Sequence, residues 1–478
     1  MPPRLQLDLH AADPAPWWGM GEVVRLAVPS VLNTVSFTIM QFVDGWMVSR
    51  VSAEALSAQF IGGITAFTPI CFFIGLVGCV STFASQNLGA GRKDRAALFG
   101  WQGLWVAWAA AAVLALLVPA APTLLGLYGH AADVTVMETQ YFQILVGGAV
   151  FNLSARALGS WFIGIHRPKM TLLAGVTGNL VNLVGNYLFI YGMYGFPKLG
   201  LVGAGIGTVL GSAAEAAVLL TAFLAGPTAA EYAVRLQRRV SREALVELLR
   251  IGSPAGGMFL ADVLVWAIFM GRIIGGFGTE ALAAAAILNR YWHLCFMPAI
   301  GVSNAVSAIV GRRCGAGRQD LAWRRAHAGL ALVMTYMVTC GTVIWFGREF
   351  FVGLFNETGG PVVQSIATSA VFFILLCQAF DALNVTFIGA LRGAGDTLWP
   401  GVVQVILAYG LGLGGSALVA HLKPEWGSLG PWGMASAYIM LLGLAMWGRF
   451  LSGGWRRIKL VEEAPAIGPE EPVSLPPG

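Results

Sequence analysis

The chain has 478 residues, of which 57% are hydrophobic and only 11% are charged, and its formal net charge is +5. This composition excludes an ordinary soluble domain, in which about 25% of residues are charged, and indicates a membrane protein. The basic residues are spread over many short loops, which argues against a nucleic-acid partner.

Long apolar segments recur along nearly the whole sequence. Each has roughly 20 or more residues, enough for a helix to cross a hydrocarbon core of about 30 Å. Hydropathy therefore predicts an all-α integral membrane protein with twelve transmembrane helices. No cleavable signal peptide is expected, because Asp and Pro occupy the place of its apolar region. The predicted spans are residues 22–48, 55–83, 97–119, 137–164, 170–192, 200–225, 248–274, 281–309, 322–346, 362–391, 397–421 and 429–451.

Lysine and arginine are distributed unequally between the two sets of loops that connect these spans. One set includes Arg92, Arg318 and the basic linker "EYAVRLQRRVSRE", whereas the other set holds few basic residues. By the positive-inside rule, the basic set and both termini face the cytoplasm. The expected location is the plasma membrane, as a multi-pass protein of a bacterial inner membrane.

The two halves of the chain repeat each other. "VSAEALSA" corresponds to "GTEALAA", "LGAGRKDRAA" corresponds to "CGAGRQDLAW", and Pro29 and Pro254 open the two halves in step. The common shift of about 226 residues indicates two parallel, pseudo-symmetric six-helix lobes, which is typical of a transporter. The predicted order is a cytoplasmic N-terminal segment (1–21), an N-lobe (22–225), a basic linker (226–247), a C-lobe (248–451) and a cytoplasmic tail (452–478).

Motifs for common enzyme sites do not fit their context. "GLVGAGIGTVLG" resembles a dinucleotide fingerprint, but it opens a membrane span, where Gly203, Gly207 and Gly211 indicate close helix packing. The sequence contains no Gly-Lys pair and hence no Walker A loop. The six cysteines and six histidines show no metal spacing. We therefore expect no catalytic residues and no resident cofactor.

The "GAGD" stretch ending at Asp396 matches a motif of intramembrane aspartyl proteases. Such an enzyme needs two carboxylates near contact. Asp381 lies fifteen residues earlier, which is roughly 22 Å along a continuous helix. Asp396 follows Arg392 at a cytoplasmic helix end and precedes Thr397, so we predict that it caps the next helix. The protease is an alternative with little support.

Three aspartates stand inside predicted spans: Asp44, Asp262 and Asp381. A central Asp costs about 2.5–3.5 kcal/mol on insertion, so it is retained where a site uses it. Gln41 and Asn33 fall on the same helix face as Asp44. We predict that this carboxylate changes its charge during a transport cycle.

Amide side chains follow the same pattern in two other spans. Asn182 and Asn186 are one turn apart in the fifth span, and Gln378 and Asn384 share a stripe with Asp381 in the tenth. A single membrane amide also serves as interhelical glue, so this alternative stays open for the asparagines.

Several stretches, in this order and at these spacings, resemble the multidrug and toxic compound extrusion (MATE) family, closest to its NorM-type branch. They are "QFVDGWMVSR", "VSAEALSA", "QNLGAGR", "GNLVNLVGNYLFIYG", "GLVGAGIGTVL" and "FIGALRGAGDTLWP". The resemblance covers roughly residues 21–450. It implies two lobes around a central cavity that opens alternately to either side, and export of organic, mostly cationic, drug-like compounds in exchange for Na⁺ or H⁺.

The resemblance also assigns residues. In the N-lobe, the implied cation or proton site comprises Asp44, Asn182, Asn186 and Thr208, to which we add Gln41 from the face of Asp44. In the C-lobe it comprises Asp262, Asp381 and the position of Cys377. Na⁺ is allowed at Asp44, or at Asp262 and Asp381 together. Motif positions with a structural role are Pro29, Arg92, Arg318, Arg392 and Asp396.

The sequence departs from the family pattern at a few positions. Cys377 replaces an aromatic hydroxyl, which weakens a Na⁺ assignment in the C-lobe, and Asn186 replaces an Asp of another branch. Glu215, Arg156 and Arg290 lie within predicted spans, and these three residues have no counterpart in the family pattern. A flippase for a lipid-linked oligosaccharide shares the fold and remains an alternative, although its anionic cargo favours a basic cavity. We expect a monomer in the lipid bilayer that binds small molecules.

Overall fold

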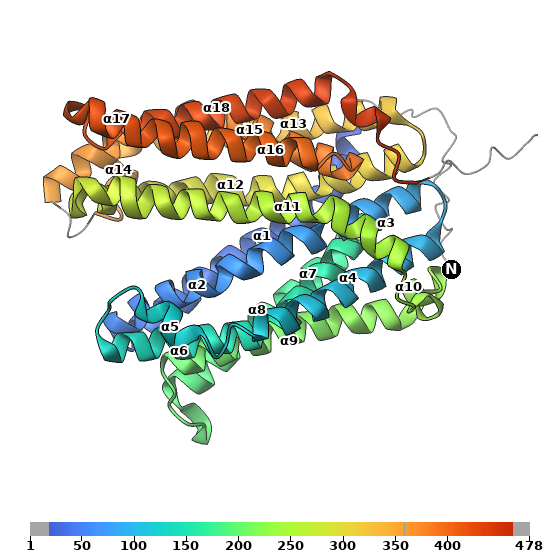
Figure 1. Ribbon diagram of the computed structural model, residues 1–478, viewed down its shortest axis with the longest axis horizontal. Helices are drawn as coiled ribbons and strands as arrows, with labels where there is room; N and C mark the ends of the chain where they lie inside the picture. Colours follow the sequence, from blue (N-terminus) through green and yellow to red (C-terminus); the bar gives the residue numbers. More distant parts are fainter. Residues whose placement is uncertain (1–18, 357–359, 462–478) are drawn as a thin grey trace, which may run out of the picture.

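The computed structural model describes residues 19–356 and 360–461, which are almost entirely helical and contain no strand. Two bundles of helices lie side by side, one from the first half of the chain and one from the second (Figure 1). The predicted fold class is thereby confirmed. Residues 1–18 of the predicted N-terminal segment and 462–478 of the predicted tail lie outside the described residues.

The N-lobe contains the elements that the structure describes before the basic linker. They are α1 (Met20–Ser49), α2 (Ala53–Gly78), α3 (Val80–Gly89), α4 (Lys93–Ala115), α5 (Ala121–Gly126), α6 (Ala132–Gly147), α7 (Ala149–Gly164), α8 (Pro168–Tyr191), η2 (Met193–Gly195) and α9 (Leu201–Leu224). The predicted linker holds α10 (Gly226–Glu231) and η3 (Val234–Gln237).

The C-lobe begins with α11, which starts inside the predicted linker. Its elements are α11 (Arg242–Ile268), η4 (Phe269–Ile274), η5 (Gly275–Phe277), α12 (Thr279–Gly315), α13 (Gln319–Phe346), α14 (Arg348–Gly353), α15 (Gly360–Ala394), α16 (Leu398–Leu407), η6 (Ala408–Gly415), α17 (Ser416–Leu422), η7 (Pro424–Trp426), α18 (Leu429–Leu451) and η8 (Gly454–Arg457).

The number of spans agrees with the sequence prediction. In the described residues, eleven helical segments are long and apolar enough to cross a membrane, and α6 with α7 makes a twelfth that is bent by 45°. The bend falls at Gly147 and Gly148, where α9 comes very close: a Cβ atom on Gly148 would lie 2.4 Å from Val209 Cγ2. The close approach thus requires glycine at the bend.

The predicted glycine packing is confirmed between α8 and α9. A Cβ atom on Gly203 would lie 2.4 Å from the carbonyl carbon of Phe189, and one on Gly211 would lie 2.7 Å from the carbonyl oxygen of Gly178. Both distances are shorter than real contacts of a Cβ atom. The small residues therefore let the two backbones touch, as in other membrane helix pairs.

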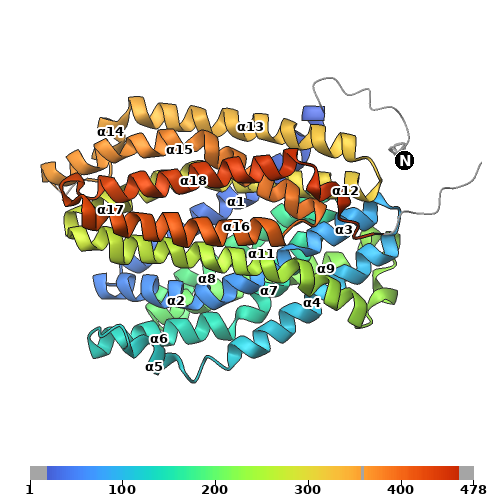
Figure 2. The same cartoon turned by 45° about the horizontal axis from the view of Figure 1, so that its top comes forward.

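The two lobes meet at the end of the molecule where α3 lies and diverge toward the α5 and α17 end (Figure 1). Figure 2 shows α3 beside α12 from a second direction. The contact is reciprocal: a Cβ on Gly89 would lie 2.0 Å from the carbonyl oxygen of Arg312, and one on Gly315 would lie 1.9 Å from that of Gln86. The repeat shift of about 226 residues relates both partners. Because the two contacts exchange equivalent residues, they lie about the pseudo-symmetry axis that relates the lobes.

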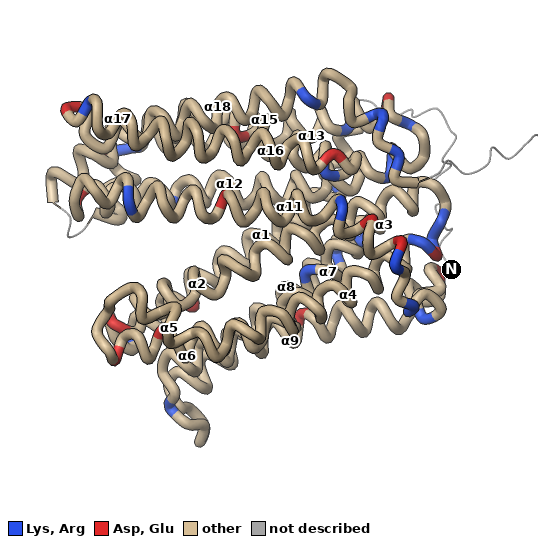
Figure 3. Tube along the Cα trace, in the orientation of Figure 1, with Lys and Arg blue, Asp and Glu red and all other residues tan. Residues whose placement is uncertain are grey.

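Most lysines and arginines gather at this same end (Figure 3). Arg92 and Arg318 precede α4 and α13 at equivalent positions, and Arg318 Nε forms an ion pair with Asp320 Oδ1 at 3.2 Å. Pro29 is buried within α1. We refer to this end as the basic end, which the positive-inside rule predicts to be cytoplasmic.

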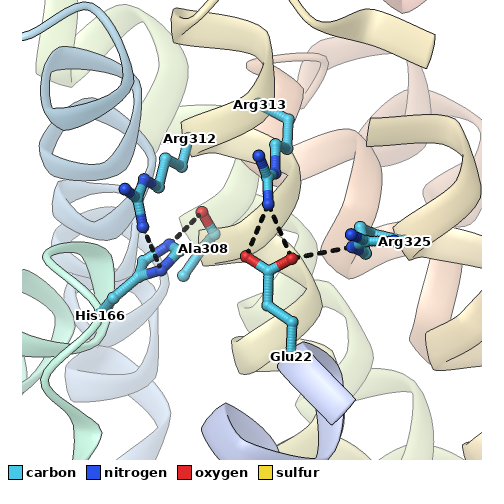
Figure 4. Close-up of polar contacts among 6 residues, drawn as sticks. All are labelled: Glu22, His166, Ala308, Arg312, Arg313 and Arg325. Atoms are coloured by element: carbon cyan, nitrogen blue, oxygen red, sulfur yellow. Dashed lines mark hydrogen bonds and ion pairs between the residues drawn. The ribbon is translucent and has the colours of Figure 1, made fainter. Parts of the chain in front are cut away.

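An ionic network joins the lobes at the basic end (Figure 4). Glu22 Oε2 of α1 accepts hydrogen bonds of 2.8 Å from Arg313 Nη2 of α12 and from Arg325 Nε of α13. These contacts and the glycine contacts hold the basic end closed, whereas the lobes diverge at the opposite end.

A second polar contact lies beside this network, in the turn between α7 and α8 (Figure 4). His166 Nε2 donates to the carbonyl oxygen of Ala308 at 3.1 Å, and Arg312 Nη1 lies 3.4 Å from His166 Nδ1. Burial, and then the positive charge of Arg312, lower the pKa of His166 to about 4. His166 is therefore neutral at the lobe interface at physiological pH.

The predicted helix cap at Asp396 is wrong. The N-cap of α16 is Thr397, without a side-chain cap bond, and Asp396 Oδ2 instead accepts a 2.8 Å hydrogen bond from Arg449 Nε of α18. A nearby guanidinium is a stronger partner for a buried carboxylate than a backbone amide. Arg392 donates to Asn304 Oδ1 of α12 at 2.9 Å. Both motif residues thus join helices.

Candidate cation sites in the two lobes

The N-lobe site centres on Asp44, which is only 5% exposed on α1. Asn186 Nδ2 donates to Asp44 Oδ1 at 2.6 Å, and Asn182 Nδ2 lies 3.4 Å from Asp44 Oδ2. The two asparagines reach the same carboxylate because they are one turn apart on α8. Asn182 Nδ2 also lies 3.4 Å from Thr208 Oγ1 of α9. The structure thus brings together four of the five predicted residues.

A glycine of α9 controls how closely the amides approach Asp44. A Cβ atom on Gly207 would lie 2.1 Å from Asn186 Oδ1 and 3.0 Å from Asn186 N. The Asn186 side chain therefore occupies the space that any larger residue would need. The glycine spacing of α9, which the sequence indicated only as packing, also positions the site.

Gln41 is not part of this cluster. Its side chain is exposed, and it makes no hydrogen bond to Asp44 in the described part of the chain. Sequence reasoning missed Tyr141 of α6, which is buried beside Thr208 and Gln59 and close enough to Asp44 to interact electrostatically. Its position within the fourth predicted span was the available signal.

The C-lobe site contains two carboxylates on different helices. Asp262 of α11 accepts a 3.2 Å hydrogen bond from Gln404 Nε2 of α16. Asp381 of α15 is 4% exposed, interacts with Asn384 and Trp292, and is close enough to Asp262 for the two charges to repel each other. Sharing a cation or a proton relieves such a repulsion.

Several amide oxygens near these carboxylates are buried and have no hydrogen-bond partner within the described residues. They are the side-chain oxygens of Gln378, Asn384 and Gln404. Buried polar atoms without partners are rare and point to a missing ligand or water. Cys377 is buried, with its Sγ atom 4.0 Å from the carbonyl oxygen of Ser436, so it lies against α18. Sequence reasoning missed Gln404, Trp292 and the buried Tyr438 of α18, which is close to both carboxylates.

The helices around the C-lobe site are irregular. The π-helical segments η4 and η6 directly follow α11 and α16, which carry Asp262 and Gln404. The π-helix is rare and often occurs at functional sites. By contrast, α1 and α8, which form the N-lobe site, are uninterrupted α-helices.

Both clusters have a composition that suits positive charge. Each contains a buried carboxylate with amide side chains beside it. No group of three or more His, Cys, Asp or Glu that could hold a metal ion occurs among residues 19–356 and 360–461. Either cluster can hold a monovalent cation or a proton, and α15 between Asp381 and Ala394 is continuous, which keeps Asp396 apart from Asp381.

Comparisons with known proteins agree with this arrangement. The family model described as MatE matches residues 29–188 and 254–418, in both lobes. A probable multidrug resistance protein NorM of Pseudomonas aeruginosa is 28% identical over 449 residues, which cover 93% of this chain and 91% of that protein. A protein of the same name from Xylella fastidiosa is 30% identical over 432 residues, covering 87% and 89%.

The fold is similar to that of solved transporters. A structure described as the outward-facing conformation of a multidrug resistance MATE family transporter of the MOP superfamily superposes with a TM-score of 0.84. The match covers 92% of this chain and 97% of that chain at 19% sequence identity. At this identity the likeness shows the fold alone.

Proposed function

The chain belongs to the MatE family of membrane transporters, and from this premise we propose that it is a multidrug efflux antiporter that exports organic, mostly cationic, compounds in exchange for Na⁺ or H⁺. The observation that carries the proposal is Asp44, buried in the N-lobe with two amide donors from α8. A carboxylate in a membrane interior is retained where its charge is used.

The arrangement of the lobes supports alternating access. The basic end is closed by Glu22 with Arg313 and Arg325 and by glycine contacts, whereas the lobes diverge at the other end. Opening the basic end requires these contacts to break, and ligands that bind the two conformations with different affinity drive the change. A cation that neutralises a buried carboxylate supplies such a difference.

The donor sets of the two clusters support a proposal for which lobe binds the coupling ion. At Asp44 the amides donate N–H groups to the carboxylate, which leaves it suited to a proton or to an organic cation. In the C-lobe, Asp262 and Asp381 lie near unpaired amide oxygens, and hard cations prefer oxygen ligands. We place Na⁺ in the C-lobe and charge exchange with protons or substrate at Asp44.

The setting follows the same reasoning. We place the transporter in a bacterial inner membrane as a monomer surrounded by lipid, with both termini in the cytoplasm, because the basic end gathers most lysines and arginines. Small drug-like molecules are its partners, without a resident cofactor, a nucleic acid or an enzymatic activity. The buried carboxylates of both lobes favour cationic cargo over the anionic lipid-linked oligosaccharide of a flippase.

Dye efflux from vesicles tests this function. Purified protein is reconstituted, a cationic fluorescent dye is loaded, and a Na⁺ gradient and a pH gradient are imposed separately. Efflux that accelerates under at least one inward gradient, and not in protein-free vesicles, is expected. Efflux that ignores both gradients would rule out antiport.

A further inference from the structure

Arg156 lies in the interior of the N-lobe, on α7. This helix packs against α2, α3, α4, α8 and α9 of its own lobe and also against α12 of the C-lobe. Most residues of α7 are buried, whereas Asn152, Arg156 and Ser160, spaced one turn apart, are only partly buried. Arg156 of this partly open stripe lies over the ring of Phe37 on α1, so the stripe faces the inside of the N-lobe.

The guanidinium of Arg156 reaches toward the helix that carries Asp44. Its Cζ atom lies 5.3 Å from the ring centre of Phe37 on α1. Phe37 precedes Asp44 by seven residues, so the two lie about 20° apart around the helix and roughly 10 Å apart along it. Arg156 is therefore on the side of Asp44 toward the basic end.

Other polar groups lie at the same level. Asn179 Nδ2 of α8 donates to Ser36 Oγ of α1 at 2.7 Å, next to Phe37. Glu215 follows Thr208 by seven residues on α9, and its Cβ atom packs against Gly178. Asn152, one turn from Arg156, has a buried side-chain oxygen without a partner in the described part of the chain. A second polar layer thus lies between the Asp44 cluster and the basic end.

A structural role would require Arg156 to form an ion pair, because an unpaired charge inside a membrane is costly. Within the described residues, no carboxylate lies within 4.0 Å of its guanidinium nitrogens, Glu215 included. Phe37 covers only a face of the planar group. The N–H groups of Arg156 donate no hydrogen bond within residues 19–356 and 360–461, so their edges can bind a carboxylate with two parallel hydrogen bonds.

We propose that Arg156 is a specificity-determining residue that binds the acidic group of zwitterionic substrates, whose cationic group lies at Asp44. The proposal rests on the proposed function only in that Asp44 receives the organic cation. The N-lobe then holds two charged subsites of opposite sign, one on each side of Phe37. Compounds with both a cation and a carboxylate gain from both, whereas simple cations use Asp44 alone.

Two dyes with one xanthylium core test this assignment. Rhodamine 110 carries a free carboxylate, and rhodamine 123 is its methyl ester. Fluorescence anisotropy measures binding of each dye to the purified transporter. Arg156→Gln should weaken binding of rhodamine 110 by about tenfold, or 1.4 kcal/mol, and change that of rhodamine 123 less than about twofold. Arg156→Lys should lie between, since its charge remains but its two-pronged geometry is lost.

Two control variants separate a specific from a structural effect. Arg290→Gln removes the arginine that lies over Phe355 in the C-lobe, at 4.8 Å from its ring centre, and should leave both dyes unaffected. Glu215→Gln should not weaken binding of rhodamine 110, because it removes only a carboxylate that would repel the carboxylate of the dye. If Glu215→Gln instead mimics Arg156→Gln, then Glu215 holds Arg156 and the assignment is wrong.

The remaining outcomes are equally decisive. The carboxylate subsite would be overturned if Arg156→Gln weakened binding of both dyes equally or weakened binding of neither. Failure of the wild type to bind rhodamine 110 would overturn it as well. Failure of the antiport proposal looks different: the wild type would bind rhodamine 123 but would not export it under either gradient.

Discussion

The two lobes have the same fold but differ in the chemistry of their interiors. In the N-lobe, a single carboxylate, Asp44, accepts N–H groups from two amides of one regular helix. In the C-lobe, Asp262 and Asp381 come from two helices, repel each other, and lie near unpaired amide oxygens and π-helical segments. The sequence repeat therefore accounts for the shared scaffold, whereas the residues of the two sites differ. We have proposed on this basis that the N-lobe site takes a proton or an organic cation and the C-lobe site a hard metal cation.

The largest effect is expected at Asp44. Asp44→Asn preserves size but removes titration, so gradient-driven dye efflux should fall by about tenfold or more, while expression and thermal stability change little. Glu54→Gln is the matched control, because Glu54 is an exposed acid in the first turn of α2. Efflux at the wild-type rate in Asp44→Asn would make this residue helix glue and shift coupling to the C-lobe.

The C-lobe carboxylates should affect one driving force only. Asp381→Asn and Asp262→Asn are expected to abolish acceleration of efflux by an inward Na⁺ gradient, because each removes an oxygen ligand charge. Efflux driven by a pH gradient through Asp44 should retain at least about half of its rate. If Asp381→Asn abolished acceleration of efflux by both the Na⁺ gradient and the pH gradient, the two lobes would not bind different coupling ions.

Gly207→Ala tests whether close packing supports the N-lobe site. The added methyl group would meet Asn186 Oδ1 at 2.1 Å, so Asn186 must move away from Asp44, at a cost of about 1–3 kcal/mol. We expect a severalfold lower efflux rate and a lower melting temperature. Gly257→Ala, where nothing lies within 4 Å of the added atom, is the control and should leave both unchanged.

Glu22→Gln should weaken the ionic network that holds the basic end closed. Its carboxylate binds Arg313 and Arg325, whose side chains are 19% and 3% exposed. Removing this charge should weaken the closed state by about 1–2 kcal/mol and raise the reactivity of Cys314, kept as the sole cysteine, by roughly 5–30-fold. Glu243→Gln removes an exposed ion pair with Arg95 and should have no effect on this reactivity.

A smaller, pH-dependent effect is expected at His166, which faces Arg312, Arg313 and Glu22. Its pKa of about 4 lies below the ordinary value of about 6.5. The stabilisation that it gives the closed interface is therefore complete above pH 6.5 and decreases as the pH falls toward 4. The reactivity of any thiol falls with pH because the thiolate is the nucleophile, so Cys314 is compared between the wild type and His166→Asn at each pH. The ratio of the two rates, wild type over variant, should rise a few times from about pH 7 to 5, and a ratio that stays constant would contradict this role.

The sequence predicted those parts of the sites that depend on one helix. Asn182 and Asn186 share a face because the helical period places them one turn apart, and Gly203 and Gly211 mark a close contact for the same reason. The grouping of these residues with Asp44 came from the family resemblance. The prediction that Gln41 joins Asp44 rested on their shared helix face. Gln41 lies about 60° from Asp44 around the helix, and this angle is large enough to leave its side chain exposed.

Partners from distant helices could not be predicted. Gln404 reaches Asp262 across 142 positions, and Arg449 reaches Asp396 across 53. Such pairs depend on the rotation and depth of each helix in its lobe, which hydropathy does not determine. Polarity within a span, as for Gln404, shows that a residue has a partner, but only the packed structure identifies it.

Direct measurement of sodium binding tests the division between the lobes most simply. Binding of radioactive Na⁺ to purified protein is compared between the wild type, Asp44→Asn and Asp381→Asn. We expect the wild type and Asp44→Asn to bind with dissociation constants within about twofold of each other, and Asp381→Asn to lose binding. Sodium binding that is lost in Asp44→Asn and retained in Asp381→Asn would contradict the assignment of the metal cation to the C-lobe.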